Sequence, residues 1–262
     1  MGDLLESIFA TYGHDLRGYA GPSIRRRVFA SLAKSGLADL SGLKKRILAD
    51  REAFERFAED LRVRVTDMFR DPRFFLHFRT RVVPILLTYP VLNIWHCGCA
   101  TGEEVYATAI VLTEEGLYER SQIYATDVSN QALRQAKAGV YAADRVAGFA
   151  DAYSASGGKA KLTDYYTEAY GGIAFRESLR ANVLFFEHNL VTDYVFAEMN
   201  VVFCRNVLLY FGAPLRERVV EKLGKSLRPG GFLCLGSSES LRGRGAEAFS
   251  VFASAEQIYR QP

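Results

Sequence analysis

The chain has 262 residues, of which 49% are hydrophobic and 24% are charged, and its formal net charge is +3. These values match ordinary folded domains and exclude a fibrous or disordered chain. The charge is too small to indicate nucleic-acid binding by itself, and the apolar stretches end well short of the roughly 18 residues that a membrane span needs. Because acids stand near the N-terminus where a signal peptide carries bases, we expect a cytoplasmic protein without membrane insertion.

The first 62 residues predict a small helical domain. Apolar side chains recur at helical spacing from Leu4 to about Leu61, and the sequence Gly21-Pro22-Ser23 predicts a helix start with Ser23 as its cap. Between Arg17 and Arg46, eight bases accompany the single acid Asp39, and they are Arg17, Arg25, Arg26, Arg27, Lys34, Lys44, Lys45 and Arg46. This basic face could dock an acidic partner, and a merely solvated face is the alternative.

Residues 63–90 predict a linker and a helix that begins at Asp71-Pro72, and residues 91–262 predict a second domain. In this domain strand-like segments alternate with helix-like ones. The strands are 92–97, 122–126, 200–204, 232–236 and 257–259, and the helices are 103–115, 130–137 and 214–227. This alternation predicts an α/β fold with a mostly parallel sheet and a ligand site at the carboxyl ends of the strands.

The stretch from about residue 141 to 182 interrupts the alternation. It holds five tyrosines and two glycine pairs, a composition that favours a short antiparallel excursion with a surface for a partner. We therefore expect a small β-subdomain inserted into the α/β domain.

Gly98 and Gly102 bracket a turn after the first predicted strand, which suits the close approach of backbone to a cofactor but is weak evidence alone. Asp127 follows Gly102 by 25 residues, at the tip of the next strand. An acid at this place can accept hydrogen bonds from both ribose hydroxyls of an adenosine cofactor. The alternative is a helix N-cap supplied by Asp127 or Ser129.

Arg205 and Asn206 directly follow the buried segment 200–204, so their side chains are expected at the same edge as the glycine turn. Arg205 is either a site residue, which we favour, or a structural ion-pair partner. The four cysteines lie in apolar segments and are expected to be buried, with no metal site and no disulfide.

Six short motifs occur in a fixed order along the chain, and together they are far more specific evidence than any one of them. They are Val65-Thr66-Asp67-Met68-Phe69-Arg70-Asp71-Pro72, the segment Trp95 to Glu104, Ala125-Thr126-Asp127, His188-Asn189-Leu190, the segment Phe203 to Phe211, and the segment Leu235 to Leu241. The chain resembles the CheR-type chemotaxis receptor protein-glutamate O-methyltransferases over nearly its whole length.

The resemblance implies a Rossmann-like methyltransferase domain with an inserted antiparallel β-subdomain, preceded by a small all-α domain. It implies S-adenosylmethionine as the cofactor, with S-adenosylhomocysteine as the product, and the cytoplasmic helical region of a chemoreceptor as the substrate. The cofactor site that it implies consists of Thr66, Arg70, Gly98, Glu104, Asp127, Asn189, Leu190 and Asn206. Arg70, Arg205 and Tyr210 match positions of the methyl-transfer centre. We expect a monomer that does not act on nucleic acid.

The implied reaction agrees with the residues present. A glutamate with a pKa of about 4.3 is already ionised at neutral pH, so its methylation needs no general base. One departure from the family pattern motivates an alternative, since Arg64 stands where the family commonly has asparagine. The chain could instead be an S-adenosylmethionine-binding interaction module with altered or lost transfer.

Overall fold

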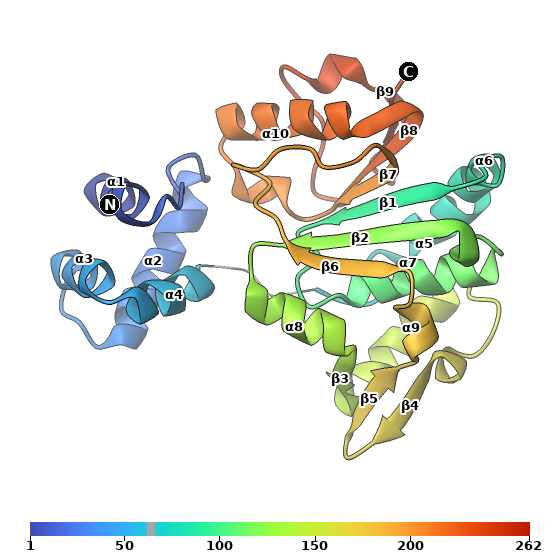
Figure 1. The fold of residues 1–262 in the computed structure, drawn as a ribbon, viewed down its shortest axis with the longest axis horizontal. Coiled ribbons are helices and arrows are strands. Elements are labelled where there is room, and N and C mark those ends of the chain that lie inside the picture. Colours follow the sequence, from blue (N-terminus) through green and yellow to red (C-terminus); the bar gives the residue numbers. More distant parts are fainter. Residues whose placement is uncertain (62–65) are drawn as a thin grey trace. The chain divides into compact units, whose positions relative to one another are not determined.

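The computed structural model describes residues 1–61 and 66–262 (Figure 1). The chain divides into two compact units. The first comprises Met1–Val63 and Leu208–Val219, and the second comprises Arg64–Val207 and Val220–Pro262. Among the helices of the described residues, none is both long enough and apolar enough to cross a membrane.

The first unit is helical. It contains α1 (Gly2–Tyr12), α2 (Gly21–Ser35), α3 (Leu40–Ala49), α4 (Arg51–Asp60), the short helix η6 (Leu208–Tyr210) and the first half of α10 (Ala213–Ser226). Its core is formed by apolar side chains such as Ile8, Val28 and Ile47. The prediction that Ser23 caps α2 is wrong, because the helix begins at Gly21 with Ala20 as its N-cap. Proline is tolerated in a first helical turn, so Pro22 lets the helix start before Ser23.

The second unit is built on a seven-stranded sheet with the order β6-β2-β1-β7-β8-β10-β9. The strands are β1 (Leu92–Cys97), β2 (Ser121–Asp127), β6 (Val183–Glu187), β7 (Met199–Cys204), β8 (Leu227–Leu235), β9 (Ser250–Ala253) and β10 (Ile258–Arg260). The first five strands in this order are parallel, and β10 pairs antiparallel with both of its neighbours. The predicted α/β fold with a mostly parallel sheet is confirmed.

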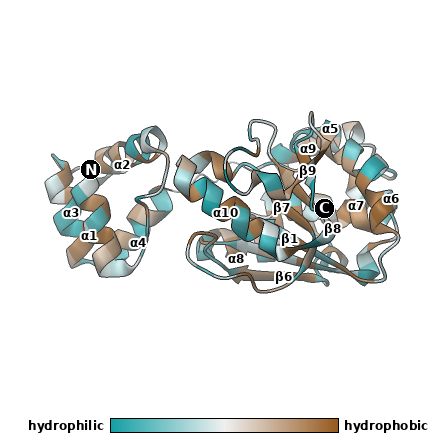
Figure 2. Ribbon diagram, turned by 90° about the horizontal axis from the view of Figure 1, so that it is seen from above, coloured by the Kyte–Doolittle hydropathy of each residue, from teal (hydrophilic) through white to brown (hydrophobic). Residues whose placement is uncertain are grey.

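From β1 the chain continues to β2, which pairs with β1 on one side. Strand β7, later in the sequence, pairs with β1 on the other side. Strand order therefore reverses between β1 and β7, and ligands of open α/β sheets bind outside the carboxyl ends of strands at such a point. Both central strands are almost entirely buried, and most residues of β7 are hydrophobic (Figure 2).

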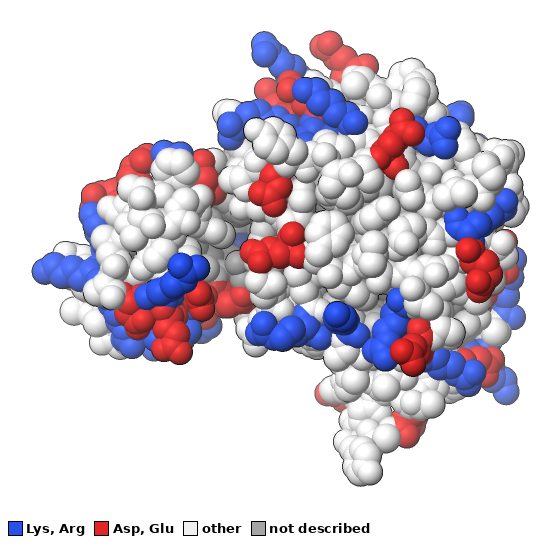
Figure 3. Space-filling view, in the orientation of Figure 1, with Lys and Arg blue, Asp and Glu red and all other residues white. Residues whose placement is uncertain are grey.

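One face of the sheet carries Ile94, Ile123 and Val201 and shares its core with the helical layer. That layer contains α5 (Pro72–His77), the π-helix η1 (Phe78–Val82), α6 (Val83–Leu86), α7 (Glu103–Glu114) and α8 (Asn130–Ala138). On the opposite face the ring of Phe196 lies 5.0 Å from that of Trp95 and 5.5 Å from that of Tyr124. The middle of this face has few charged side chains (Figure 3).

The predicted inserted subdomain is present. It contains a three-stranded antiparallel sheet of β3 (Val140–Ala142), β5 (Gly172–Phe175) and β4 (Tyr166–Ala169), in that order. Tyr170 and Gly171, with φ angles of 53° and 74°, form the two-residue turn between β4 and β5, as a tight hairpin requires. The region also contains the helix α9 (Val146–Ala155), which the tyrosine and glycine pattern does not indicate.

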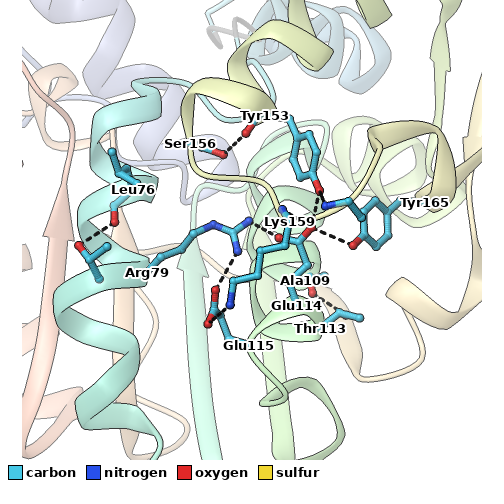
Figure 4. A network of polar contacts seen from close by, with 12 residues as sticks. Leu76, Arg79, Ala109, Thr113, Glu114, Glu115, Tyr153, Ser156, Lys159 and Tyr165 are labelled. Carbon is cyan, nitrogen blue, oxygen red and sulfur yellow. Dashed lines mark hydrogen bonds and ion pairs between the residues drawn. The ribbon is translucent and has the colours of Figure 1, made fainter.

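The far end of α7 is joined to the insert by a polar network (Figure 4). The buried carboxylate of Glu114 accepts hydrogen bonds from the hydroxyl groups of Tyr153 and Tyr165 and forms an ion pair with Arg79. Burial, followed by the Glu114 carboxylate, raises the pKa of Tyr153 to about 12, so the tyrosine keeps its hydroxyl proton at neutral pH. The insert is therefore joined to the α/β fold at this end of the helix.

Candidate active site

Polar residues follow five parallel strands at one edge of the sheet. The glycine turn 98–102 follows β1, Asp127 ends β2, Asn189 comes shortly after β6, Arg205 and Asn206 follow β7, and Glu239 comes shortly after β8. Because the carboxyl ends of parallel strands meet at the same edge, the fold brings together residues that lie up to 141 positions apart in the sequence.

The two glycine positions of the turn have no room for a side chain. Gly98 and Gly102 have φ angles of 68° and 91°, and a Cβ on Gly98 would lie 2.8 Å from Cγ2 of Val207. A Cβ on Gly102 would lie 2.8 Å from Cβ of Ala136. Even Ala100, between them, is left-handed with a φ of 47°. The turn is thus a strained, closely packed backbone segment, as functional sites often contain.

Asp127 binds the turn and is not a helix cap. Its Oδ2 accepts the N–H of Ala100 (2.9 Å) and its Oδ1 accepts the N–H of Ser129 (2.8 Å). The cap of α8 is Ser129, whose hydroxyl accepts the N–H of Ala132 (3.1 Å). The two oxygens of a carboxylate together offer about four acceptor positions, so an acid at this place is suited to binding both the turn and a ribose diol.

Arg205 is the most highly connected side chain at this edge. Its guanidinium forms ion pairs with Glu104 (Nη1 to Oε2, 2.6 Å) and Asp71 (Nη2 to Oδ2, 2.7 Å), and its side chain is only 1% exposed. It also donates to the carbonyls of Arg70 and Leu235, and it lies 4.1 Å over the ring of Phe74. The sequence leaves open whether Arg205 is a site residue or a structural ion-pair partner. In the structure it lies at this edge and also forms ion pairs.

Glu104 lies between Arg205 and His96, whose Nδ1 is 3.3 Å from Oε1 of the glutamate. Burial alone raises the pKa of Glu104, but the Arg205 guanidinium and the His96 ring outweigh it, and the pKa falls below its ordinary value. His96 is itself buried and stacks on Phe203 with a ring separation of 4.4 Å. Glu104 is thus held as a carboxylate in a fixed position.

The segment before α5 carries Thr66 and Arg70. Phe69 and Asp71, on either side of Arg70, have φ angles of 52° and 58°, which residues with side chains rarely adopt. Arg205 fixes this strained turn through Asp71 and the Arg70 carbonyl. The Arg64 position lies outside the described residues.

Asn189 and Leu190 lie in a turn that is stabilised from two sides. The N–H of Asn189 donates to Oδ2 of Asp193 (2.8 Å), and Oδ1 of Asn189 accepts the N–H of Val191 (3.0 Å). Lys222, from the second half of α10, donates to the carbonyls of Leu190 (2.8 Å) and Asp193 (2.5 Å). These contacts give the turn a defined conformation.

Asn206 is positioned by Glu239, a residue to which the sequence analysis assigns no role. Oε2 of Glu239 accepts the N–H of Asn206 and the N–H of Gly236, both at 2.7 Å. Asn206 is left-handed with a φ of 61°, and a Cβ on Gly236 would lie 2.6 Å from its Nδ2. An acid four residues after the β8 strand end is the sequence signal that could have identified this contact.

Tyr210 belongs to the first unit, whereas the other predicted site residues belong to the second. In the first unit its ring lies 4.4 Å below the Arg27 guanidinium, and its carbonyl accepts the N–H of Ala20 (2.8 Å). The predicted role of Tyr210 in methyl transfer stays a prediction.

The four cysteines are buried and free, as predicted for small hydrophobic side chains. Together, the tight glycine turn, the carboxylate at the tip of β2 and the fixed polar side chains after β6 and β7 suit an adenosine-type cofactor. The turn supplies close backbone, and Asp127 supplies the acceptor for a diol.

Comparison with known proteins identifies relatives of this chain. The sequence profile described as CheR methyltransferase, SAM binding domain, matches residues 64–258. The Cher3 protein of Pseudomonas putida is 42% identical over 259 residues, which span 98% of this chain and 95% of that protein. Chemotaxis protein methyltransferase 1 of Pseudomonas aeruginosa is 30% identical over 254 residues, 90% of this chain and 88% of that protein. The chemotaxis protein methyltransferase of Vibrio parahaemolyticus is 30% identical over 232 residues, 84% and 81% of the two chains.

Proposed function

We propose that this chain, which belongs to the CheR methyltransferase family, transfers methyl groups to glutamate side chains of a chemoreceptor and forms glutamate methyl esters. Its cofactor is S-adenosylmethionine. Relatives named chemotaxis protein methyltransferases support the choice of substrate class. The observation that carries the proposal is the carboxyl edge of the sheet, where a glycine turn bound by Asp127 adjoins a fixed Arg205–Glu104 pair.

The chemistry requires positioning rather than proton transfer. Bound S-adenosylmethionine supplies a methyl carbon that is activated by its sulfonium sulfur. The substrate glutamate is ionised at neutral pH, so the protein has only to hold one carboxylate oxygen about 3–3.5 Å from that carbon and in line with it. This requirement explains why no side-chain nucleophile paired with a general base is needed among the described residues of the site.

We assign different tasks to the two arginines. Arg205 is buried and already paired with two carboxylates, so it fixes the site and is poorly placed to grip a third. Arg70 is half-buried and is held through its own carbonyl. We assign to Arg70 the orientation of the substrate carboxylate, and we assign to Glu104, Asp127, Asn189 and Asn206 the binding of the cofactor.

The first unit supplies a surface that suits a helical acidic substrate. A groove of about 750 Å³ lies along α1 and the start of α2. Its apolar lining includes Leu5, Ile24 and Phe29, and the exposed Arg25 and Arg26 lie beside them. An amphipathic helix with acids beside its apolar stripe matches this pattern. Loss of a negative charge on methylation would then change the electrostatics of the helical receptor.

Labelled cofactor tests the proposal. The protein is incubated with methyl-labelled S-adenosylmethionine and the cytoplasmic fragment of a candidate chemoreceptor, and the receptor is then treated with mild base. Because methyl esters hydrolyse in base, the proposal requires label that base releases. Label that survives base would sink the ester assignment.

The Arg70→Ala variant is the companion to this experiment. We expect it to abolish transfer while it retains measurable binding of S-adenosylhomocysteine, and unchanged transfer would refute the role of Arg70. Tight cofactor binding by the wild-type protein without transfer to any receptor fragment would favour the interaction module instead.

A further inference from the structure

The stem of the inserted subdomain reaches into the cofactor edge. This stem consists of β3 and the short helix η3 (Ala143–Arg145). The Tyr141 hydroxyl donates to the carbonyl of Thr101, in the glycine turn, at 2.6 Å. Arg145 extends further, because its two terminal nitrogens bind two different segments of the methyltransferase fold.

Nη1 of Arg145 lies 2.6 Å from Oε1 of Glu103, the first residue of α7. Nη2 of Arg145 donates to the carbonyl of Thr66 at 2.7 Å. Thr66 opens the segment 66–70 that the resemblance places in the cofactor site. One guanidinium therefore bridges the start of α7 and this segment.

Glu103 is an unusual anchor for such a bridge, since its side chain is 0% exposed. Burial raises the pKa of Glu103, while the Thr101 hydroxyl (2.7 Å from Oε2) and Arg145 act in the opposite direction. A buried carboxylate needs a charged partner close by. Glu103 therefore holds the Arg145 guanidinium in place by an ion pair. This position of the guanidinium allows its second nitrogen to reach the carbonyl of Thr66.

We propose that Arg145 is a positioning residue through which the inserted subdomain holds the segment 66–70 in its cofactor-binding conformation. The insert then contributes to cofactor affinity although no residue of its sheet lies among the predicted cofactor contacts. This inference rests on the cofactor site described above, and it does not depend on which protein is methylated.

The Arg145→Lys variant separates the two contacts. A single ammonium can keep the ion pair with Glu103, but it lacks the fork that spans Glu103 and Thr66 together. We expect the variant to stay folded, with a thermal midpoint within a few degrees of wild type. We expect S-adenosylhomocysteine to bind about tenfold more weakly in calorimetry, which corresponds to about 1.4 kcal/mol.

Hydrogen–deuterium exchange supplies a second measurement that needs neither cofactor nor substrate. In the cofactor-free variant we expect faster exchange in peptides that cover residues 66–70, because their anchor is lost, and unchanged exchange in the sheet. A general loss of stability would accelerate exchange across the whole unit instead.

Arg180→Lys is the matched control. Arg180 is also half-buried and also holds backbone carbonyls, those of Lys137 and Ala138, both at 3.0 Å. It makes no contact with Glu103 or Thr66 among the described contacts. We expect this variant to bind S-adenosylhomocysteine as the wild type does.

The double variant Glu103→Gln/Arg145→Met removes the pair without leaving a buried unpaired charge. If Arg145→Lys fails to fold, this variant decides the question, and we expect the same weak binding and fast exchange at 66–70. Wild-type affinity and wild-type exchange at 66–70 in these variants would overturn the proposal, as would an equal loss in Arg180→Lys. Failure of the wild type to methylate receptors would leave all these readouts intact and would count against the proposed function alone.

Discussion

Arg205 illustrates how one buried side chain can hold several segments of the fold together. Burying a guanidinium is costly unless charged partners surround it, and here Glu104 and Asp71 both do so. The same contacts fix the start of α7 and the turn before α5. These ionic groups therefore satisfy one another at the carboxyl ends of the strands.

Removal of Arg205 is predicted to destabilise the second unit in a pH-dependent way. Arg205→Met leaves the buried carboxylate of Glu104 without its partner, so we expect a loss of about 3–5 kcal/mol in the free energy of unfolding at neutral pH. The pKa of Glu104 is lowered in the folded protein, so its stabilising contribution is present above the ordinary carboxyl range and is lost as the pH falls through the folded value.

The difference in the free energy of unfolding between wild type and Arg205→Met should therefore narrow as the pH falls below the ordinary carboxyl range. Urea unfolding followed by the fluorescence of Trp95, the only tryptophan of the chain, measures it. Arg51→Met is the control, since its pair with Glu55 is exposed and contributes little. A gap that stays constant with pH would contradict the role of Glu104.

Asp127 is predicted to bind the cofactor diol. Asp127→Asn loses a charged acceptor and points an amide N–H₂ toward a backbone N–H, so we expect the affinity for S-adenosylhomocysteine to fall by about tenfold to a hundredfold. Calorimetry measures this change. Glu187→Gln is the control, because Glu187 pairs with Asp127 in the β2–β6 register but is exposed and binds Asn130. Equal affinity of Asp127→Asn and wild type would exclude the diol contact.

At the scale of elements, the glycine turn depends on packing as well as on backbone conformation. Gly98 and Gly116 have nearly equal φ angles of 68° and 67°, but only a Cβ on Gly98 meets a neighbour, Val207 at 2.8 Å. Both alanine variants carry the strain of a left-handed residue, about 1–2 kcal/mol. The difference in stability and cofactor affinity between the two variants therefore reports the effect of the close contact between the turn and Val207, which follows β7.

We predict that Gly98→Ala lowers the affinity for S-adenosylhomocysteine at least about tenfold, because displacement of Val207 also moves Asn206 beside it. Gly116→Ala should lose stability only. Calorimetry and thermal unfolding compare the two, and Gly98→Ala/Val207→Ala should recover part of the affinity. If both glycine variants bind alike, the packing argument fails.

Element prediction from the sequence succeeds where one physical signal dominates. The strands at 92–97 and 200–204 are largely apolar segments, and both are confirmed as β1 and β7. The edge strand β6 is missed although Val183 to Phe186 is apolar, because so short an apolar run at the end of the predicted insert does not by itself indicate a strand of the main sheet. The helix α9 is missed because tyrosines and glycines nearby favour a β assignment.

At the scale of the whole molecule, the order of short motifs predicts which residues share one edge, because parallel strands bring their ends together. It does not predict their partners. Arg145 and Glu103 are 42 residues apart, and Arg205 and Asp71 are 134 apart. No local pattern encodes such a pair, so these contacts become visible only in the fold.

The groove of the first unit is predicted to recognise the receptor. Arg25→Glu/Arg26→Glu reverses two exposed charges beside an apolar lining, so we expect kcat/KM for a receptor fragment to fall about tenfold or more at low salt. The affinity for S-adenosylhomocysteine should not change. Lys45→Glu/Arg51→Glu is the control, because these exposed cations lie outside the lining of the groove. An equal effect of both charge reversals would show that the receptor is attracted by surface charge in general and not bound by this groove.

The identity of the methylated atom tests the account most directly. Peptide mass spectrometry of a chemoreceptor cytoplasmic fragment, after incubation with this protein and S-adenosylmethionine, locates each added methyl group before and after mild base. We predict methyl groups on glutamate side chains, lost after base and absent with the Arg70→Ala variant. Base-stable methyl groups on nitrogen, or the absence of methylation from every receptor fragment despite bound cofactor, would contradict the account.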